Sequence, residues 1–232
     1  EGLKWNRRFS IYDETDSQTL VKEIVTQDMS LDPKKYDPKK IKWAISNSKN
    51  QCLTPDQVKE KADNHFDETI ADVYRKYRIA LSKNNALDFD DLLLLPVFLL
   101  KQNDSVRDYW HKRFKHILVD EYQDTNRTQY ELIKLITTGK LDSNNFSNWD
   151  NRSIFVVGDA DQSIYSFRAA DFRILIGFQE DFKSQSLKKN DTIVKLEDNY
   201  RSTSNILNAA NNLIENNIER IDKVLRATKG DG

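Results

Sequence analysis

Cysteine and histidine are too scarce in this chain for a disulfide framework or a zinc framework. Cys52 is the single cysteine among 232 residues, so no disulfide can form within the chain, and a reducing compartment is the simplest setting. The three histidines, His65, His111 and His116, do not have the paired spacing of zinc ligands. The sequence therefore excludes a disulfide scaffold and argues against a zinc protein.

Long apolar runs are also missing. The longest, Leu92 to Leu100, is interrupted by Pro96 and falls well short of the about 20 residues that span a bilayer. The first residues do not have the pattern of a secretory signal. We therefore expect a cytoplasmic protein, nucleoid-associated if its source is bacterial, with no membrane partner.

No excess of positive charge marks the chain as a general nucleic-acid clamp. Its 36 Lys and Arg residues balance 37 Asp and Glu residues, which gives a net charge of −1. Local clusters can still bind phosphates, and the first half contains three, at 39–40, 59–61 and 75–78. The alternative for each cluster is a solvated helix face. The chain has 38% hydrophobic and 31% charged residues, a balance typical of a globular protein.

The apolar pattern divides the chain into a helical first half and an α/β second half. Apolar steps of three and four residues predict helices over 10–25 and 54–81, the second beginning with a Thr54 cap and Pro55. No strand of a nucleotide-binding sheet is visible before residue 115, so the first half is predicted to be all-α. The second half alternates like a parallel sheet with covering helices. Its predicted strands lie at 116–120, 153–157 and 193–196, its helices at about 126–138, 170–180 and 203–217, and an exposed loop at 141–152.

Two carboxylates stand directly after the first predicted strand. Asp120 and Glu121 end the apolar run Ile117-Leu118-Val119. Parallel strands deliver side chains to ligands at their carboxyl ends, and Mg²⁺ prefers one or two carboxylates completed by waters. One acid could hold the hydrated ion while the other orients an attacking water. The alternative is a strand that ends in solvated acids.

A second apolar strand passes through Gly158 into a polar and aromatic segment. Gln162 can both donate and accept hydrogen bonds, so it suits a terminal phosphate or a positioned water. Tyr165, Phe167 and Arg168 bring two flat rings and a cation into one stretch. Because every base can stack on an aromatic face, this set suits single-stranded nucleic acid. The alternative is that both rings are core residues of a helix.

A third segment pairs Tyr200 with Arg201 after a short apolar run. Tyr200 offers a stacking face. A planar guanidinium can stabilise the charge that develops on a transferring phosphoryl group, and lysine lacks this fork geometry. The alternative for any single arginine is a surface salt bridge.

Together these segments resemble motifs of the superfamily 1 DNA helicases of the UvrD/PcrA/Rep type: VDEYQDTN at 119–126, GDADQSIYSFRAAD at 158–171 and NYRS at 199–202. LDFDDL at 87–92 is also similar to a family segment, so the resemblance covers nearly the whole chain. It implies ATP-dependent translocation 3′ to 5′ on single-stranded DNA with duplex unwinding, and ATP and Mg²⁺ as cofactors. Phe167 departs from the Trp of close members, and Ala169-Ala170 departs from the common Gly-Ala. Neither departure removes a catalytic group.

The resemblance also implies a role for each candidate residue. Asp120 would hold Mg²⁺, and Glu121 would activate water. Gln162 would contact the γ-phosphate, Tyr200 would stack on adenine, and Arg201 would act as an arginine finger. Tyr165, Phe167 and Arg168 would line the single-strand path.

The implied fold class is α/β, a partial RecA-like parallel-sheet motor domain preceded by an all-α inserted subdomain. The resemblance divides the chain into three parts. They are a 1B-like all-α subdomain at 1–87, the C-terminal part of motor domain 1A at 88–195, and the start of a 2A-like second motor domain at 196–232.

A glycine-rich phosphate loop, G-x-x-x-x-G-K-[ST], is absent from the sequence. None of the six glycines stands in that relation to a following Lys-Ser or Lys-Thr. Without the amides and the lysine of such a loop, we expect the chain to bind ATP poorly and to hydrolyse it negligibly. We interpret it as an internal piece of a larger helicase, with the rest of the parent chain and single-stranded and duplex DNA as partners.

Two other functions remain open. A helicase–nuclease subunit of the RecB/AddA type has similar segments, although that kin more often has Pro-Lys where this chain has Ala160-Asp161. The other is a non-catalytic DNA-binding module that lost its phosphate loop. The retained Asp120-Glu121, Gln162 and Arg201 speak against such decay. A phosphate loop upstream would favour the motor, and a nuclease domain downstream would favour the RecB/AddA type.

Overall fold

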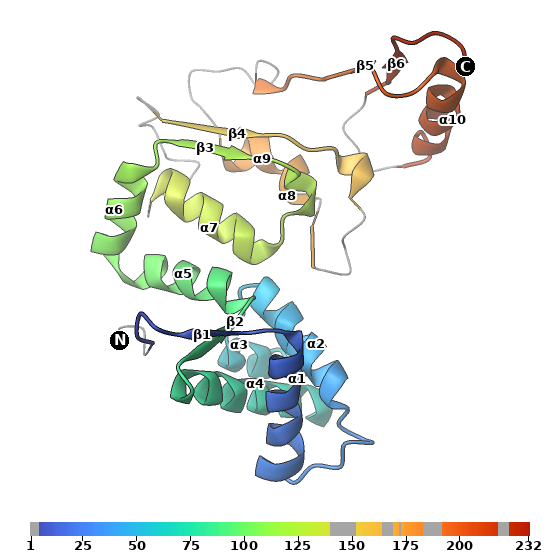
Figure 1. Cartoon of the computed structure of the whole chain (residues 1–232). Helices are drawn as coiled ribbons and strands as arrows, with labels where there is room; N and C mark the ends of the chain where they lie inside the picture. Colours follow the sequence, from blue (N-terminus) through green and yellow to red (C-terminus); the bar gives the residue numbers. More distant parts are fainter. Residues whose placement is uncertain (1–4, 140–151, 164–168, 172, 183–191, 218–222) are drawn as a thin grey trace. The chain divides into compact units, whose positions relative to one another are not determined.

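The protein forms two compact units. A computed structural model describes residues 5–139, 152–163, 169–171, 173–182, 192–217 and 223–232 (Figure 1). Unit 1 comprises residues 1–115, 126–140 and 167–169, and unit 2 comprises residues 116–125, 141–166 and 170–232. The largest cluster of buried apolar side chains belongs to unit 1.

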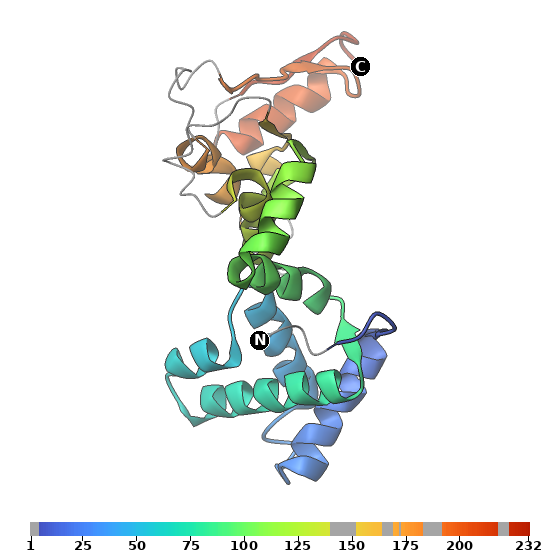
Figure 2. The same ribbon diagram turned by 90° about the vertical axis from the view of Figure 1, so that its left-hand side faces the viewer.

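Unit 1 is mainly helical, and its described residues include one short parallel strand pair. In this pair β1 (Ser10–Tyr12) lies in register with β2 (Ala86–Asp88), so that Ser10 faces Ala86. Figure 2 shows the short helix α3 beside the long helix α4. The helices are α1 (Glu14–Glu23), a π-helical turn (Ile24–Asp28), α2 (Pro38–Asn50), α3 (Pro55–Glu60), α4 (His65–Lys83), α5 (Asp91–Gln102), α6 (Asp104–Arg113) and α7 (Arg127–Thr138).

The core of unit 1 is built on one face of α4. Val73, Tyr74, Tyr77 and Leu81 recur at steps of one, three and four residues and are fully buried. They share a buried cluster with residues of α1 and α2. Since burying a side chain of this size contributes about 1.5–3 kcal/mol, this face contributes strongly to the stability of the unit.

The prediction of an all-α first half is wrong. The predicted helix over 10–25 begins instead with β1, because Ser10 to Tyr12 find a strand partner at 86–88, far along the chain. The predicted helix over 54–81 divides into α3 and α4. Asn64 starts the second helix, since its side chain accepts hydrogen bonds from the backbone N–H groups of Phe66 and Asp67. The predicted Thr54 start is confirmed by a reciprocal capping box with Gln57.

A fully buried lysine connects several elements of unit 1. The ammonium of Lys49 donates to Asp88 at 2.8 Å and to Asp91 at 2.7 Å. The Tyr77 hydroxyl donates to Asp88 at 2.9 Å, and the Thr128 hydroxyl donates to the Lys49 carbonyl at 2.5 Å. The cluster therefore joins α2, α4, α5, α7 and β2.

In this cluster, the effect of burial on each pKa is opposed by attraction between Lys49 and the two carboxylates. Burial alone would lower the pKa of Lys49, but attraction to Asp91 and Asp88 outweighs it, and the pKa is raised. Burial would raise the pKa of Asp88, yet the charge and hydrogen bonds of Lys49 outweigh it, and that pKa is lowered. At Asp91 burial prevails, and the pKa is raised. One ammonium thus supports two buried carboxyl groups.

The described residues of unit 2 form two short parallel strand pairs and several short helices. β3 (His116–Val119) pairs with β4 (Ser153–Val156), and β5 (Asp198–Asn199) pairs with β6 (Arg226–Ala227). The predicted strands at 116–120 and 153–157 are therefore confirmed. The remaining elements are the 3₁₀ turns η2 (Tyr122–Asp124) and η4 (Ala160–Gln162) and the helices α8 (Arg173–Ile176), α9 (Phe178–Asp181) and α10 (Ser204–Ile214).

Two predictions for the second half need correction. Residues 193–196 are not a strand, and Val194 and Leu196 are 80% and 78% exposed. The strand is β5 at 198–199 instead. Its position is set by hydrogen bonding to β6 at 226–227, and the apolar run at 193–196 has no such partner in the register of the described residues. The predicted helix over 170–180 is two short helices separated at Gly177. The predicted loop over 141–152 lies almost wholly outside the described residues.

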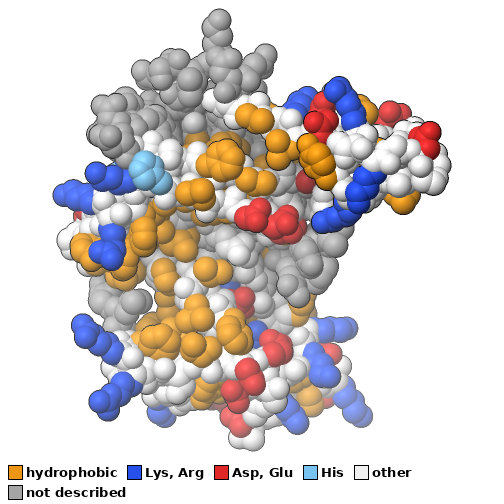
Figure 3. Space-filling view, turned by 45° about the horizontal axis from the view of Figure 1, so that its top comes forward, with side chains coloured by type: hydrophobic (Ala, Val, Ile, Leu, Met, Phe, Trp, Pro, Cys, Tyr) orange, Lys and Arg blue, Asp and Glu red, His pale blue; other side chains and the backbone are white. Residues whose placement is uncertain are grey.

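One face of the β3–β4 pair is apolar and exposed. Leu118 and Phe155 are opposite each other in the register and are 75% and 58% exposed. Figure 3 shows hydrophobic side chains gathered on the molecular surface in this view. Among the helices that the structure describes, none has the length and apolar content to cross a membrane.

We predict that Lys49→Met lowers the free energy of unfolding by about 3–5 kcal/mol, because it leaves two buried carboxyl groups without their cation. Lys40→Met is the matched control, since Lys40 is an exposed residue of the same helix. Urea unfolding followed by circular dichroism measures both variants. Equal stability of the two variants would contradict the account.

Candidate nucleotide site

Parallel pairing brings two polar segments to the same edge of a sheet in unit 2. β3 and β4 lie side by side (Figure 1), with Val119 opposite Val156. The pairing continues past both strands, because Val157 donates to the Val119 carbonyl at 2.8 Å and Tyr122 donates to the Val157 carbonyl at 2.9 Å. The residues that follow each strand therefore emerge next to each other.

The acids after β3 stand on an unusual backbone. Glu121 has φ 49° and ψ 43°, the left-handed region that costs a residue with a Cβ about 1–2 kcal/mol. This conformation turns the chain abruptly from β3 into η2. The Glu121 N–H donates to the Asp120 carboxylate at 2.9 Å, and both acids are exposed. They are open to a ligand from solvent.

A small aromatic core holds η2 in place. Tyr122 is fully buried and meets Phe178 of α9 edge to face, with ring centroids 5.7 Å apart. Phe178 in turn contacts Phe182 at 5.1 Å. The Asp171 N–H donates to the Thr125 carbonyl at 3.1 Å. The turn that carries the acids is thus held by Phe178 of α9 and by the backbone of Asp171.

Gln123 joins the two strand ends and was given no role in the sequence analysis. Gln123 is buried, with only 2% of its surface exposed. Its amide nitrogen donates to the Glu121 carboxylate at 2.7 Å, and its amide oxygen accepts from the Asp159 N–H at 3.0 Å. The only sequence signal was its place inside VDEYQDTN.

Gln162 is connected to the same arrangement through Asp159. Its amide donates to the Asp159 carboxylate at 2.7 Å, and its N–H donates to the Asp159 carbonyl at 3.0 Å. Burial would raise the pKa of Asp159, but hydrogen bonds from Lys223 and Gln162 outweigh it, and the pKa is lowered. The structure therefore brings Asp120, Glu121 and Gln162 together around one hydrogen-bonded network.

Gly158 allows the two strand ends to approach closely. A Cβ at this position would lie 2.7 Å from the amide oxygen of Gln123 and 3.2 Å from the backbone nitrogens of Tyr122 and Gln123. The first distance is shorter than real Cβ contacts. Glycine at 158 thus leaves room for the Gln123 amide, and a larger residue would have to displace that amide.

Tyr200 and Arg201 follow β5 in a turn of their own. Asn199 holds this turn, because its side chain accepts from the N–H groups of Arg201 and Ser202 at 3.0 and 2.8 Å. Tyr200 is 71% exposed, and Arg201 is exposed too. Within the described part of the chain, no hydrogen bond or ion pair joins either residue to Asp120, Glu121 or Gln162. Tyr165, Phe167 and Arg168 lie outside the described residues.

The donor set after β3 fits Mg²⁺. Mg²⁺ is bound through one or two carboxylates and keeps several waters, and Asp120 and Glu121 supply two exposed carboxylates. No group of three or more potential metal ligands occurs among the described residues, so a metal held entirely by protein side chains does not fit there.

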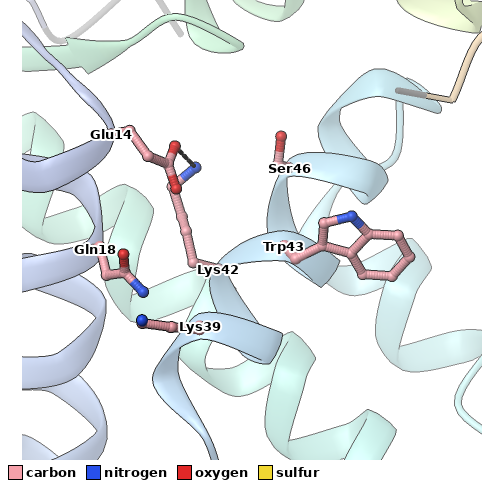
Figure 4. A pocket seen from close by; sticks show the side chains of 6 residues that line it. All are labelled: Glu14, Gln18, Lys39, Lys42, Trp43 and Ser46. Atoms are coloured by element: carbon pink, nitrogen blue, oxygen red, sulfur yellow. Dashed lines mark ion pairs between the residues drawn. The ribbon is translucent and has the colours of Figure 1, made fainter. Parts of the chain in front are cut away.

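A separate pocket of about 370 Å³ lies in unit 1 between α1 and α2. Figure 4 shows Glu14 and Lys42 pointing toward each other across it, at 3.6 Å, while the ring of Trp43 points away. Lys39, from the first predicted basic cluster, also lines it. No candidate residue of the nucleotide site lies in this pocket.

Comparison with known proteins gives consistent results. The family model described as the UvrD/REP helicase N-terminal domain matches residues 1–183. The chain is 39% identical over 226 residues to the ATP-dependent DNA helicase PcrA of Staphylococcus epidermidis, covering 97% of this chain. It is 40% identical over 227 residues to PcrA of Bacillus subtilis, covering 98% of this chain. It spans only 28% of the length of each of these relatives.

We predict that Gly158→Ala lowers the free energy of unfolding by about 1–3 kcal/mol, because the added methyl group overpacks the contact with Gln123. Urea unfolding measures this loss. The double variant with Gln123→Ala removes the nearest clashing atom, so its loss should be smaller than the sum of the two single losses. Additive losses, or an unchanged stability in Gly158→Ala, would contradict the close approach.

Proposed function

The chain belongs to the UvrD/REP helicase family, and we propose that it supplies part of the ATP-driven motor of a DNA helicase. The observation that carries this proposal is the meeting of Asp120, Glu121 and Gln162 at the carboxyl ends of two parallel strands. Ligands of parallel sheets bind at such ends. ATP is the proposed substrate and Mg²⁺ the proposed cofactor.

We assign the phosphate chemistry to three side chains. Asp120 holds the hydrated Mg²⁺, and Glu121 accepts a proton from the attacking water. Gln162 donates its amide to the γ-phosphate, for which it would exchange its present bond to Asp159. When bound, Mg²⁺ supplies positive charge that neutralises the phosphate oxygens.

Two further side chains are proposed to complete the site from the second motor domain. Tyr200 stacks on adenine, and Arg201 stabilises the developing charge on the phosphoryl group as an arginine finger. Their exposure supports this assignment, because both side chains are open to a ligand. The energy of hydrolysis would drive 3′ to 5′ translocation on single-stranded DNA and unwinding of the duplex.

The isolated chain is proposed to be inactive. It contains no glycine-rich phosphate loop, so the amides and lysine that hold the triphosphate must come from elsewhere in the full-length protein. We propose a partial RecA-like motor domain 1A at 88–195, the start of domain 2A at 196–232, and a 1B-like subdomain at 1–87. We propose a location close to DNA, because these relatives are named ATP-dependent DNA helicases.

In the full-length protein, Glu121→Gln should leave ATP binding nearly unchanged but abolish most DNA-stimulated hydrolysis. Water activation fails, while Asp120 still holds Mg²⁺. Steady-state turnover and nucleotide affinity are measured together, with the exposed Glu215→Gln as the matched carboxyl-to-amide control. Turnover within a few-fold of wild type in Glu121→Gln would refute the proposed site.

The proposed DNA contacts have their own test. Tyr165→Ala and Phe167→Ala in the full-length protein should each weaken single-stranded DNA binding by about 1–3 kcal/mol, since each removes a stacking face. The loss should depend little on base sequence. Tyr109→Ala, which removes a 56% exposed ring of unit 1 outside the quoted motifs, is the control. Fluorescence titration with labelled oligonucleotides decides it, and unchanged affinity in both variants would assign the two rings to packing.

A further inference from the structure

Gln123 is a buried amide whose two ends bind two different segments. Its nitrogen binds the carboxylate of Glu121 after β3, and its oxygen binds the backbone N–H of Asp159 after β4. The Gln123 carbonyl also accepts from the Ser163 hydroxyl at 3.4 Å. Gln123 thus contacts both Glu121 and the turn that carries Gln162.

Only an uncharged amide of this length satisfies both contacts. A carboxylate partner needs a donor, and a backbone N–H needs an acceptor, so the bridging side chain must offer one of each. Glutamate at 123 would offer acceptors alone. Methionine would fill a similar volume and offer neither. Because the residue is 2% exposed, water replaces a lost hydrogen bond poorly.

The bridge continues to Gln162. Three hydrogen bonds in series run from Glu121 to Gln123, from Gln123 to Asp159 and from Asp159 to Gln162, at 2.7, 3.0 and 2.7 Å. The Gln123 amide oxygen lies against Gly158, where a Cβ would come within 2.7 Å of it. The Glu121 carboxylate, proposed to act on the water, is therefore connected to the backbone of the turn that carries Gln162.

The Glu121 carboxylate has few other restraints. Its residue is exposed, and its backbone is in the left-handed region at the start of η2. Among the described residues, the bond from Gln123 is the one hydrogen bond to this carboxylate. Loss of this bond would leave the carboxylate free to change rotamer, and a misplacement of about 1 Å can cost 10²-fold in rate.

We propose that Gln123 is a positioning residue that sets the Glu121 carboxylate relative to the turn carrying Gln162. This inference rests on the proposed function and deepens it. Because Gln123 is buried, we assign it no contact of its own with the nucleotide or the attacking water. It acts through the Glu121 carboxylate, and the Asp159 N–H anchors its amide oxygen.

The test uses the full-length protein with Gln123→Met and Gln123→Glu, the second of which keeps the shape of the side chain. Both should lower kcat by about 10- to 100-fold while KM for ATP and nucleotide affinity stay within about threefold. Gln102→Met is the control, because Gln102 is exposed at the end of α5. A parallel loss of nucleotide affinity would overturn the proposal in favour of a merely structural role.

A readout independent of turnover is the hydrogen exchange of the segment 158–163. Gln123→Met should speed exchange of the Asp159 amide by about tenfold or more, since that N–H loses its acceptor. The control should leave this exchange unchanged. Unaltered exchange in Gln123→Met would overturn the bridge itself.

A double variant separates this inference from the proposed function. If Gln123 acts through Glu121, then Glu121→Gln with Gln123→Met should hydrolyse ATP no more slowly than Glu121→Gln alone. Full turnover in Glu121→Gln would sink the proposed function. Lost turnover in Glu121→Gln together with wild-type turnover in both Gln123 variants would sink only the positioning role.

Discussion

The parallel pairing of β3 with β4 is the constraint on which the candidate site depends. Val119 opposite Val156 places both strand ends at one edge, and the hydrogen bonds of Val157 and Tyr122 extend that alignment into the polar turns. A shift of one residue would move every side chain of a strand to the other face. The left-handed Glu121 and the missing side chain of Gly158 then allow the turns to approach until one amide, that of Gln123, can span them.

The two units bury different kinds of polar side chain. Unit 1 buries a formal charge at Lys49 and surrounds it with Asp88, Asp91 and the hydroxyl of Tyr77, which ties helices from distant parts of the sequence together. Unit 2 buries an uncharged amide at Gln123 and keeps the carboxylates of Asp120 and Glu121 at the surface. The first arrangement suits a structural support. The second leaves charged groups available to a ligand while their positions stay fixed.

The sequence predicted the features that depend on local pattern. β3, β4, α7 and the Thr54 cap follow from apolar runs and capping residues, and the family follows from long motifs. It did not predict β1 with β2 or the place of β5, because each of these strands is defined by a partner far along the chain. Asp120, Glu121 and Gln162 were found as separate motif residues. Their link through Gln123 was missed, since a hydrogen bond between two turns has no pattern in a single sequence.

The most direct measurement is a crystal structure of the full-length protein with Mg²⁺ and a non-hydrolysable ATP analogue. The account predicts the γ-phosphate at the carboxyl ends of β3 and β4, with Mg²⁺ held through Asp120 and the Gln162 amide within hydrogen-bond distance of a phosphate oxygen. The Gln123 amide should still bridge Glu121 and Asp159. A triphosphate bound away from these strand ends, with Asp120 and Gln162 out of its reach, would contradict the account.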